Sequence, residues 1–271
     1  MLSVWLPMER HMAVTALDDR SVPQGMAQAE WQARCDLAAC YQLVDLYGWS
    51  DLSGTHISAR IPGSEHFLIN PYGLLFDQIT ASNLVKVDQE GNVVGDSDFP
   101  VNPAGFLIHS CIHHARPDVH CVLHTHTRAG NAVAMQRDGL LPLNQKALII
   151  LGWVAYHDYE GVVLDASEQE SLVRDLGDNK ILIMRNHGLM TCGDSVAAAF
   201  VWMHRAEAAC RYQVDGLAGG VPLHYLSEAV QQKTIEQGRR IFAPNGHARS
   251  GMEWPSLLTQ LERERGTSYR S

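Results

Sequence analysis

Two patterns of hydrophobic and polar positions follow one another along the chain, and together they predict helices at both ends with short strands between them. Residues 27–49 and 194–219 carry apolar side chains at helical spacing, and glycines lie at the end of each stretch. Two further helices are predicted over 104–118, ending before Pro117, and over about 128–137. Short apolar runs between turn residues predict the strands, which lie at 56–61, 66–71, 83–95 as a hairpin, 119–126, 146–164 with bends at Gly152 and Gly161, and 180–193.

This order of elements is typical of a single layered domain with a mostly antiparallel sheet and helices packed on it. Pro23 and Gly25 mark the end of a loose N-terminal leader, residues 1–25, and residues 26–222 form the folded domain. Residues 223–271 are more polar and helical in parts. We therefore expect them to form a helical extension that packs on the domain or on a neighbouring subunit.

The composition agrees with a folded domain and argues against two classes of function. Hydrophobic residues make up 46% of the 271 residues and charged residues 19%, which allows a sizeable core. The formal net charge is −9 and no basic run occurs, so nucleic acid is not expected as a partner. No apolar run approaches the ~20 residues of a membrane span, and the N-terminal stretch lacks the features of a signal peptide. Six scattered cysteines without a CxxC pair suit a reducing compartment, so we expect a soluble cytoplasmic protein.

Three histidines near predicted strand ends form the first candidate site. His124 and His126 lie two apart on one predicted strand, so their side chains point to the same face. His187 follows another apolar strand and precedes Gly188, which allows a tight turn. Three imidazoles from two strand ends can bind a metal ion with one position left open, as catalytic zinc requires. Spacing alone also allows ordinary hydrogen-bonded histidines, because the chain has fourteen of them.

Five motifs between Trp31 and Gly219 resemble the class II aldolase/adducin family, and they follow the family's order along the chain. The motifs are HTHTRAGNAVA, RNHGLMTCGDSVAAAF, INPYGLLFDQITASNLVKVD, HSCIHHARPD and AYHDYEG. Details such as NPAGF and ARPDV are closer to the adducin-like branch than to the sugar-phosphate aldolases. A single HxH motif is weak evidence, whereas five ordered motifs are strong.

The resemblance implies a fold, a metal site and an assembly. The fold is three-layer α/β/α, with a central, mainly antiparallel sheet flanked by helices over residues 26–222. His124, His126 and His187 match the family's metal ligands, which implies one divalent ion per subunit, zinc before manganese, iron or cobalt. No organic cofactor is expected. The family's enzymes are commonly homotetramers with active sites at subunit interfaces, and they act on small molecules.

Several positions depart from the sugar-phosphate aldolases of this family. Their acid/base glutamate lies four residues before a helix histidine that matches His109, and that position is Gly105 here. The phosphate-binding positions are changed to Pro103-Ala104, Tyr72-Gly73 and His56. Proline lacks an N–H and alanine lacks a hydroxyl, so these residues bind a phosphate poorly. We therefore do not expect retro-aldol cleavage of a sugar phosphate by the standard route.

These departures favour a metal-dependent lyase that cleaves a C–C bond, by decarboxylation or a retro-aldol step, in a small non-phosphorylated substrate. The predicted catalytic residues are His56, Tyr72 and Arg185, and Arg185 could hold a carboxylate or form a structural ion pair. His109 and His157 are further candidates, although His157 could simply hold a strand end or a subunit contact. His113, His114 and His120 are expected to be ordinary surface or core residues. Two alternatives stay open: a non-catalytic adducin-like module for self-association or protein binding, and an iron-dependent oxygenase.

Overall fold

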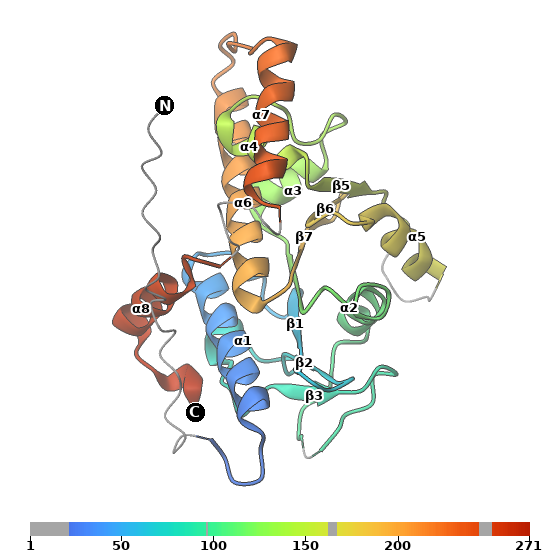
Figure 1. Ribbon diagram of the computed structural model, residues 1–271, viewed down its shortest axis with the longest axis vertical. Coiled ribbons are helices and arrows are strands. Elements are labelled where there is room, and N and C mark those ends of the chain that lie inside the picture. Colours follow the sequence, from blue (N-terminus) through green and yellow to red (C-terminus); the bar gives the residue numbers. More distant parts are fainter. Residues whose placement is uncertain (1–21, 96, 162–166, 244–250) are drawn as a thin grey trace.

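A computed structural model describes residues 22–95, 97–161, 167–243 and 251–271, and Figure 1 shows the arrangement of its elements. The predicted leader over residues 1–25 therefore lies almost entirely outside the described residues. Within the described residues, no helix is both long enough and apolar enough to cross a membrane.

The described strands form one sheet in the order β3-β2-β1-β4-β7-β6-β5. Every neighbouring pair is antiparallel except β5 and β6, which are parallel. The prediction of a central, mainly antiparallel sheet is therefore confirmed. The strands are β1 (His56–Arg60), β2 (Phe67–Ile69), β3 (Val85–Val87), β4 (Cys121–Thr125), β5 (Val154–His157), β6 (Ile181–Met184) and β7 (Gly188–Gly193).

Helices cover both faces of this sheet and complete the predicted α/β/α layers (Figure 1). On one side lie α1, α3 and α6, and on the other side lie α2 and α5. Alternate residues of β4 show the division, because Leu123 packs in the first core and Val122 in the second. The helices are α1 (Gln28–Leu46), α2 (Pro103–Ala115), α3 (Arg128–Ala134), α4 (Gln145–Leu151), α5 (Ser167–Leu176), α6 (Val196–Ala218), α7 (Glu228–Ile241) and α8 (Trp254–Arg265).

One predicted strand segment is wrong. Residues 145–151 form the helix α4, and the strand β5 begins only at Val154. The side chain of Asn144 accepts a hydrogen bond from the backbone N–H of Ala147 at 3.0 Å, which caps the first turn of α4. This cap and the burial of Leu148 and Ile150 outweigh the strand preference of the branched residues.

The described part of residues 223–271 packs on the domain of its own chain. Helix α7 lies along α4, and Gly238 permits this close approach because any Cβ there would collide with the carbonyl of Ile149. Helix α8 packs on α1, where the indole of Trp254 donates a hydrogen bond to Asp36 at 3.2 Å. The division of the chain at residues 25/26 and 222/223 stays a prediction.

Candidate metal centre

Three histidine side chains meet at one end of the sheet. His124 lies in β4, His126 follows that strand, and His187 lies in the turn between β6 and β7. One ring nitrogen from each lies within 4.8 Å of the other two, and the ring centroids are 4.7 to 5.0 Å apart. The structure thus brings together the three residues that the sequence singles out. We call these three residues the histidine triad.

The backbone around Gly188 explains how two distant segments form this triad. Strand β7 pairs with β4 beginning at Thr125 and Leu189, so the turn before β7 lies beside the HxH segment. A Cβ at Gly188 would lie only 2.5 Å from the carbonyl oxygen of Thr125, so no larger residue fits there. Asn186 turns the chain with a φ of +57°, a left-handed conformation that asparagine tolerates better than most residues.

Hydrogen bonds orient two of the three rings. The Nδ1 of His124 donates to the backbone carbonyl of Leu189 at 3.0 Å, and the Nδ1 of His126 donates to the carboxylate of Asp51 at 2.9 Å. Because a carbonyl and a carboxylate only accept, each ring in its neutral form carries its proton on Nδ1 and keeps a lone pair on Nε2. A metal-binding histidine is held in the same way by its surroundings in metalloproteins.

The two free lone pairs of this arrangement face each other. The Nε2 atoms of His124 and His126 are 2.9 Å apart, although neither carries a hydrogen in the tautomers set by their partners. Two such lone pairs repel each other, and a cation that both nitrogens bind would remove the repulsion. The donor set of the triad therefore fits a divalent metal ion, and all-imidazole ligation suits zinc and its neighbours.

Burial keeps two members of the triad, His124 and His187, in the form that binds metals. Loss of solvent around His124 lowers its pKa well below the ordinary histidine value, and the neighbouring His56 and His187 lower it further. Burial and the nearby His126 lower the pKa of His187 to about 4. Both imidazoles are therefore neutral at pH 7, and a neutral imidazole is the metal-binding species.

His56 and Gly105, which the sequence treats as separate departures from the family, form one structural feature. His56 pairs with His124 in the β1–β4 register, and the two ring centroids are 5.1 Å apart. A Cβ added to Gly105 would lie 2.6 Å from Cδ2 of His56. The imidazole therefore fills the space that a side chain at position 105 would need. With the His56 ring in this position, a side chain at position 105 would collide with it.

The other two predicted catalytic residues are placed differently from each other. Arg185 lines a hollow of about 490 Å³ together with Tyr159, whose ring lies 6.3 Å from that of His187. The guanidinium of Arg185 donates to the backbone carbonyl of Gln136 at 2.8 Å and lies over the ring of Tyr156. Tyr72 is 45% exposed in the loop after β2, and no described contact joins its side chain to the triad.

His157 is separate from the triad. Its Nδ1 lies 2.9 Å from a carboxylate oxygen of Asp175, and its Nε2 lies 3.4 Å from Glu168. Both ring nitrogens are thus engaged with carboxylates from α5, and the side chain is almost fully buried. This arrangement ties the end of β5 to α5, as the structural reading of the AYHDYEG motif predicts.

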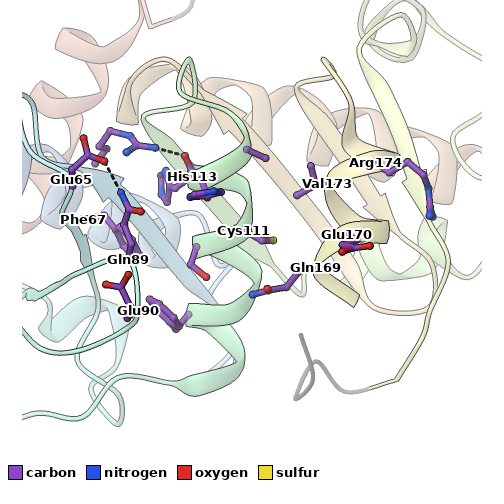
Figure 2. A pocket seen from close by; sticks show the side chains of 15 residues that line it. Glu65, Phe67, Gln89, Glu90, Cys111, His113, Gln169, Glu170, Val173 and Arg174 are labelled. Carbon is purple, nitrogen blue, oxygen red and sulfur yellow. Dashed lines mark hydrogen bonds between the residues drawn. The ribbon is translucent and has the colours of Figure 1, made fainter. Parts of the chain in front are cut away.

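A larger hollow of about 600 Å³ lies between α2, α5 and the β2–β3 region, and Figure 2 shows its side chains. The stacked rings of Phe67 and Phe106 form part of its wall, and Glu65 and Gln89 hydrogen-bond to each other at its rim. None of the three histidines of the triad lines it. His113 does, and the structure shows that this residue is buried and hydrogen-bonded to Ser58.

Ser58 is not among the predicted site residues and His113 is expected to be an ordinary surface or core residue, yet the two are buried and hydrogen-bonded to each other. Alternate positions of β1 place His56 and Ser58 on the face that α2 covers, and positions four apart on α2 place His109 and His113 over them. The spacing 56/58 and the spacing 109/113 are the signals that could have indicated this cluster.

Comparison with known proteins agrees with the fold. The family model for the class II aldolase and adducin N-terminal domain matches residues 35–214. This chain belongs to the class II aldolase/adducin family, as the motifs predict. A solved aldolase II superfamily protein from Pseudomonas syringae is 49% identical, with a TM-score of 0.85, over 91% of this chain and 98% of that one.

Two further relatives represent the two branches of the family. Alpha-adducin of Rattus norvegicus is 47% identical over 211 residues, which are 76% of this chain but only 29% of that longer protein. The structure of L-fuculose 1-phosphate aldolase from Glaciozyma antarctica is 28% identical, with a TM-score of 0.76, over 93% of this chain and 98% of that one. The chain is thus similar both to a protein named as an aldolase and to part of the much longer alpha-adducin.

Proposed function

We propose that this protein is a divalent-metal-dependent lyase that cleaves a C–C bond of a small oxygenated or carboxylated substrate without a phosphate group. The observation that carries the proposal is the pair of Nε2 atoms of His124 and His126, which face each other 2.9 Å apart without a proton in the tautomers that their partners set. Membership of the class II aldolase/adducin family supports the same class of chemistry.

His124, His126 and His187 would hold one divalent ion per subunit, zinc before manganese, iron or cobalt. When bound, such an ion acts as a Lewis acid that stabilises the negative charge left by decarboxylation or by a retro-aldol cleavage. The triad would supply three protein ligands, which would leave a position for substrate, as in catalytic sites.

His56 and Arg185 would orient the substrate beside the triad. The imidazole of His56 fills the space next to Gly105, the position that matches the acid/base glutamate of the sugar-phosphate aldolases. Its ring lies against that of His124, so a substrate at the triad would contact it. Arg185 uses part of its guanidinium on Gln136 and keeps further N–H donors for a carboxylate in the adjoining hollow. The role of Tyr72 stays a prediction without such support.

The beginning of α2 argues against a phosphate handle. Proline at position 103 opens this helix and has no N–H to offer, and Gly105 contributes no hydroxyl. Anion sites at helix N-termini depend on free N–H groups in the first turn. The substrate that we propose therefore carries carboxyl or hydroxyl groups and needs no phosphate.

We also propose that the protein is a homotetramer with active sites at subunit interfaces. Three large apolar side chains near the triad or the adjoining hollow are exposed in the single chain: Leu52 by 73%, Met135 by 60% and Tyr159 by 52%. Leu52 is next to Asp51, which binds His126, and Tyr159 packs against His187. Such a patch suits contact with another subunit. Free cysteines throughout the described residues suit the reducing cytoplasm that we propose as its location.

An assay panel on the metal-loaded protein tests the proposed activity. Release of CO₂ from hydroxylated or keto dicarboxylic acids would support a decarboxylase, and release of an aldehyde or dihydroxyacetone would support a retro-aldol enzyme. Either activity should disappear in His124→Ala and persist in His114→Ala, because His114 is an exposed residue outside the triad. Uptake of O₂ with iron, without C–C cleavage, would replace the lyase by the oxygenase alternative.

The second candidate function is a non-catalytic module for self-association or protein binding. The 47% identity to part of alpha-adducin favours this alternative. A protein that contains no metal, shows no turnover in the whole panel and still forms an oligomer would support the module and contradict the lyase.

A further inference from the structure

A chain of hydrogen bonds runs beneath the triad, through the interior between β1 and α2. The Nδ1 of His56 lies 2.7 Å from the Nε2 of His109, and the Nδ1 of His109 lies 2.6 Å from the hydroxyl of Ser58. The same hydroxyl lies 2.7 Å from the Nε2 of His113, whose Nδ1 lies 3.3 Å from the backbone carbonyl of Val119. The four side chains are at most 3% exposed.

The carbonyl of Val119, at the end of this series of hydrogen bonds, determines which atom donates in every bond. A carbonyl oxygen only accepts, so the Nδ1 of His113 carries a hydrogen and its Nε2 must accept. The hydroxyl of Ser58 therefore donates to His113 and accepts from the Nδ1 of His109. The Nε2 of His109 in turn accepts from the Nδ1 of His56. The Nε2 of His56 is then left without a hydrogen.

The charge state of the rings agrees with this assignment. Burial, together with the charge of Arg60, whose guanidinium hydrogen-bonds to the carbonyl of His113, lowers the pKa of His113 to about 3. Burial also lowers the pKa of His109 well below the ordinary value. With neutral rings, each imidazole has one donor and one acceptor, and the order of donors along the chain has a single solution.

We propose that Val119, His113, Ser58 and His109 fix the tautomer of His56, so that its unprotonated Nε2 is offered to whatever binds beside His124. The three side chains act as positioning residues, because they reach the site only through His56. The proposal deepens the proposed function, since the site concerned is the histidine triad. It adds a specificity rule: the group of the ligand that meets His56 is a hydrogen-bond donor, such as a hydroxyl, a carboxylic acid or a bound water molecule.

The contacts of His56 support a role beyond packing. Its ring lies against that of His124, and the register of β1 and β4 places the two residues directly opposite each other. Among the described residues, no hydrogen bond uses its Nε2. This nitrogen is not among the fully buried unpaired atoms of the described residues, so a ligand or a water molecule at the site can donate to it.

Nitrogen-15 NMR of histidine-labelled, metal-free protein tests the proposal without any need for activity. The signals of His56, His109 and His113 are assigned by single substitutions, and the shifts of the two ring nitrogens report which one carries the hydrogen. We expect all three rings to carry it on Nδ1. A hydrogen on the Nε2 of His56 or of His109 in the unmodified protein would overturn the proposal.

Two substitutions of Ser58 separate positioning from packing. Ser58→Ala removes the hydroxyl that joins the two rings of α2, and we expect the single tautomer of His56 to be lost. Ser58→Thr keeps the hydroxyl and should restore it. A His56 signal unchanged in Ser58→Ala would contradict the proposal. If Ser58→Ala does not fold, the spectrum of the unmodified protein decides alone. A protein without metal or lyase activity would end the proposed function but leave this spectrum unchanged.

Discussion

The histidine triad and His157 are both largely buried, yet their ring nitrogens face different partners. In the triad, His124 and His126 each give one nitrogen to an acceptor and turn the other toward a second imidazole. His157 instead places one carboxylate at each ring nitrogen, Asp175 at Nδ1 and Glu168 at Nε2. A histidine with one ring nitrogen that has no protein donor or acceptor can bind a ligand. A histidine with carboxylates at both ring nitrogens stabilises the fold instead. The following experiments test this difference.

Alanine substitution of His124 and of His157 should have opposite effects on metal binding and on stability, and this is the largest difference that we expect. His124→Ala should lose metal binding completely and leave the folded oligomer intact. His157→Ala should keep the metal and lose about 1–3 kcal/mol of unfolding free energy, because it leaves the buried Glu168 without its partner. Elemental analysis and urea unfolding of both variants measure the two effects. Equal loss of stability in both variants would remove the distinction.

The buried neutral imidazoles should make the metal-free protein sensitive to acid. The folded pKa values of His113 and His187 are lowered to about 3 and about 4, while an unfolded chain binds protons near pH 6.5. Between these values the unfolded state holds more protons, so stability falls as the pH falls. Each such ring should remove about 1.4 kcal/mol per pH unit below about pH 6.

Urea unfolding at pH 7.0 and 5.5 measures this effect. His113→Gln should have a smaller loss between the two pH values than the unmodified protein. The exposed neighbour offers a matched control, because His114→Gln should leave the pH dependence unchanged. A stability that is the same at both pH values would contradict the assignment of neutral buried rings.

The contact between His56 and Gly105 predicts that their effects are coupled. Gly105→Ala should destabilise the protein by about 1–3 kcal/mol, since the new Cβ would lie 2.6 Å from the His56 ring. His56→Asn in the same chain should relieve this cost. Gly216→Ala, in the open part of α6, is the control and should be neutral or stabilising. Thermal or urea unfolding of the unmodified protein, Gly105→Ala, His56→Asn and the double variant measures the coupling, and additive effects would contradict the contact.

The smallest expected effect concerns the partner that orients His126. Asp51→Ala removes the carboxylate that accepts from Nδ1, at a half-exposed position. Loss of such an orienting partner typically weakens metal binding about 10–100-fold. A zinc competition assay measures this loss, with the exposed Asp138→Ala as control. An unchanged affinity would mean that Asp51 does not orient the ring.

Much of the fold and the triad could be predicted from the sequence, because local patterns and ordered motifs carry them. The alternation around His124 and His126 indicates one shared face, and Gly188 after His187 indicates a turn. Helix α4 could not be recognised from its apolar run, because the cap of Asn144 and the burial against α6 and α7 decide its conformation.

The contacts of His56 were hidden for a different reason. His56 and His109 are 53 positions apart, and their meeting depends on how α2 is placed over β1. The same is true of Ser58 and His113, which are 55 positions apart. Sequence spacing shows which residues share one element, but not which two elements bring their polar faces together. From the sequence, Gly105 therefore indicates only that the acid/base glutamate is missing. The structure shows that the His56 ring occupies the space beside it.

Titration of metal-free protein with zinc in a calorimeter tests the central claim most directly. We predict that one ion binds per chain and that His124 and His187 release no protons at pH 7, because both imidazoles are already neutral. We also predict that binding is abolished in His124→Ala and retained in His114→Ala. No binding to the unmodified protein, or equal binding to His124→Ala, would contradict the assignment of the triad as a metal centre.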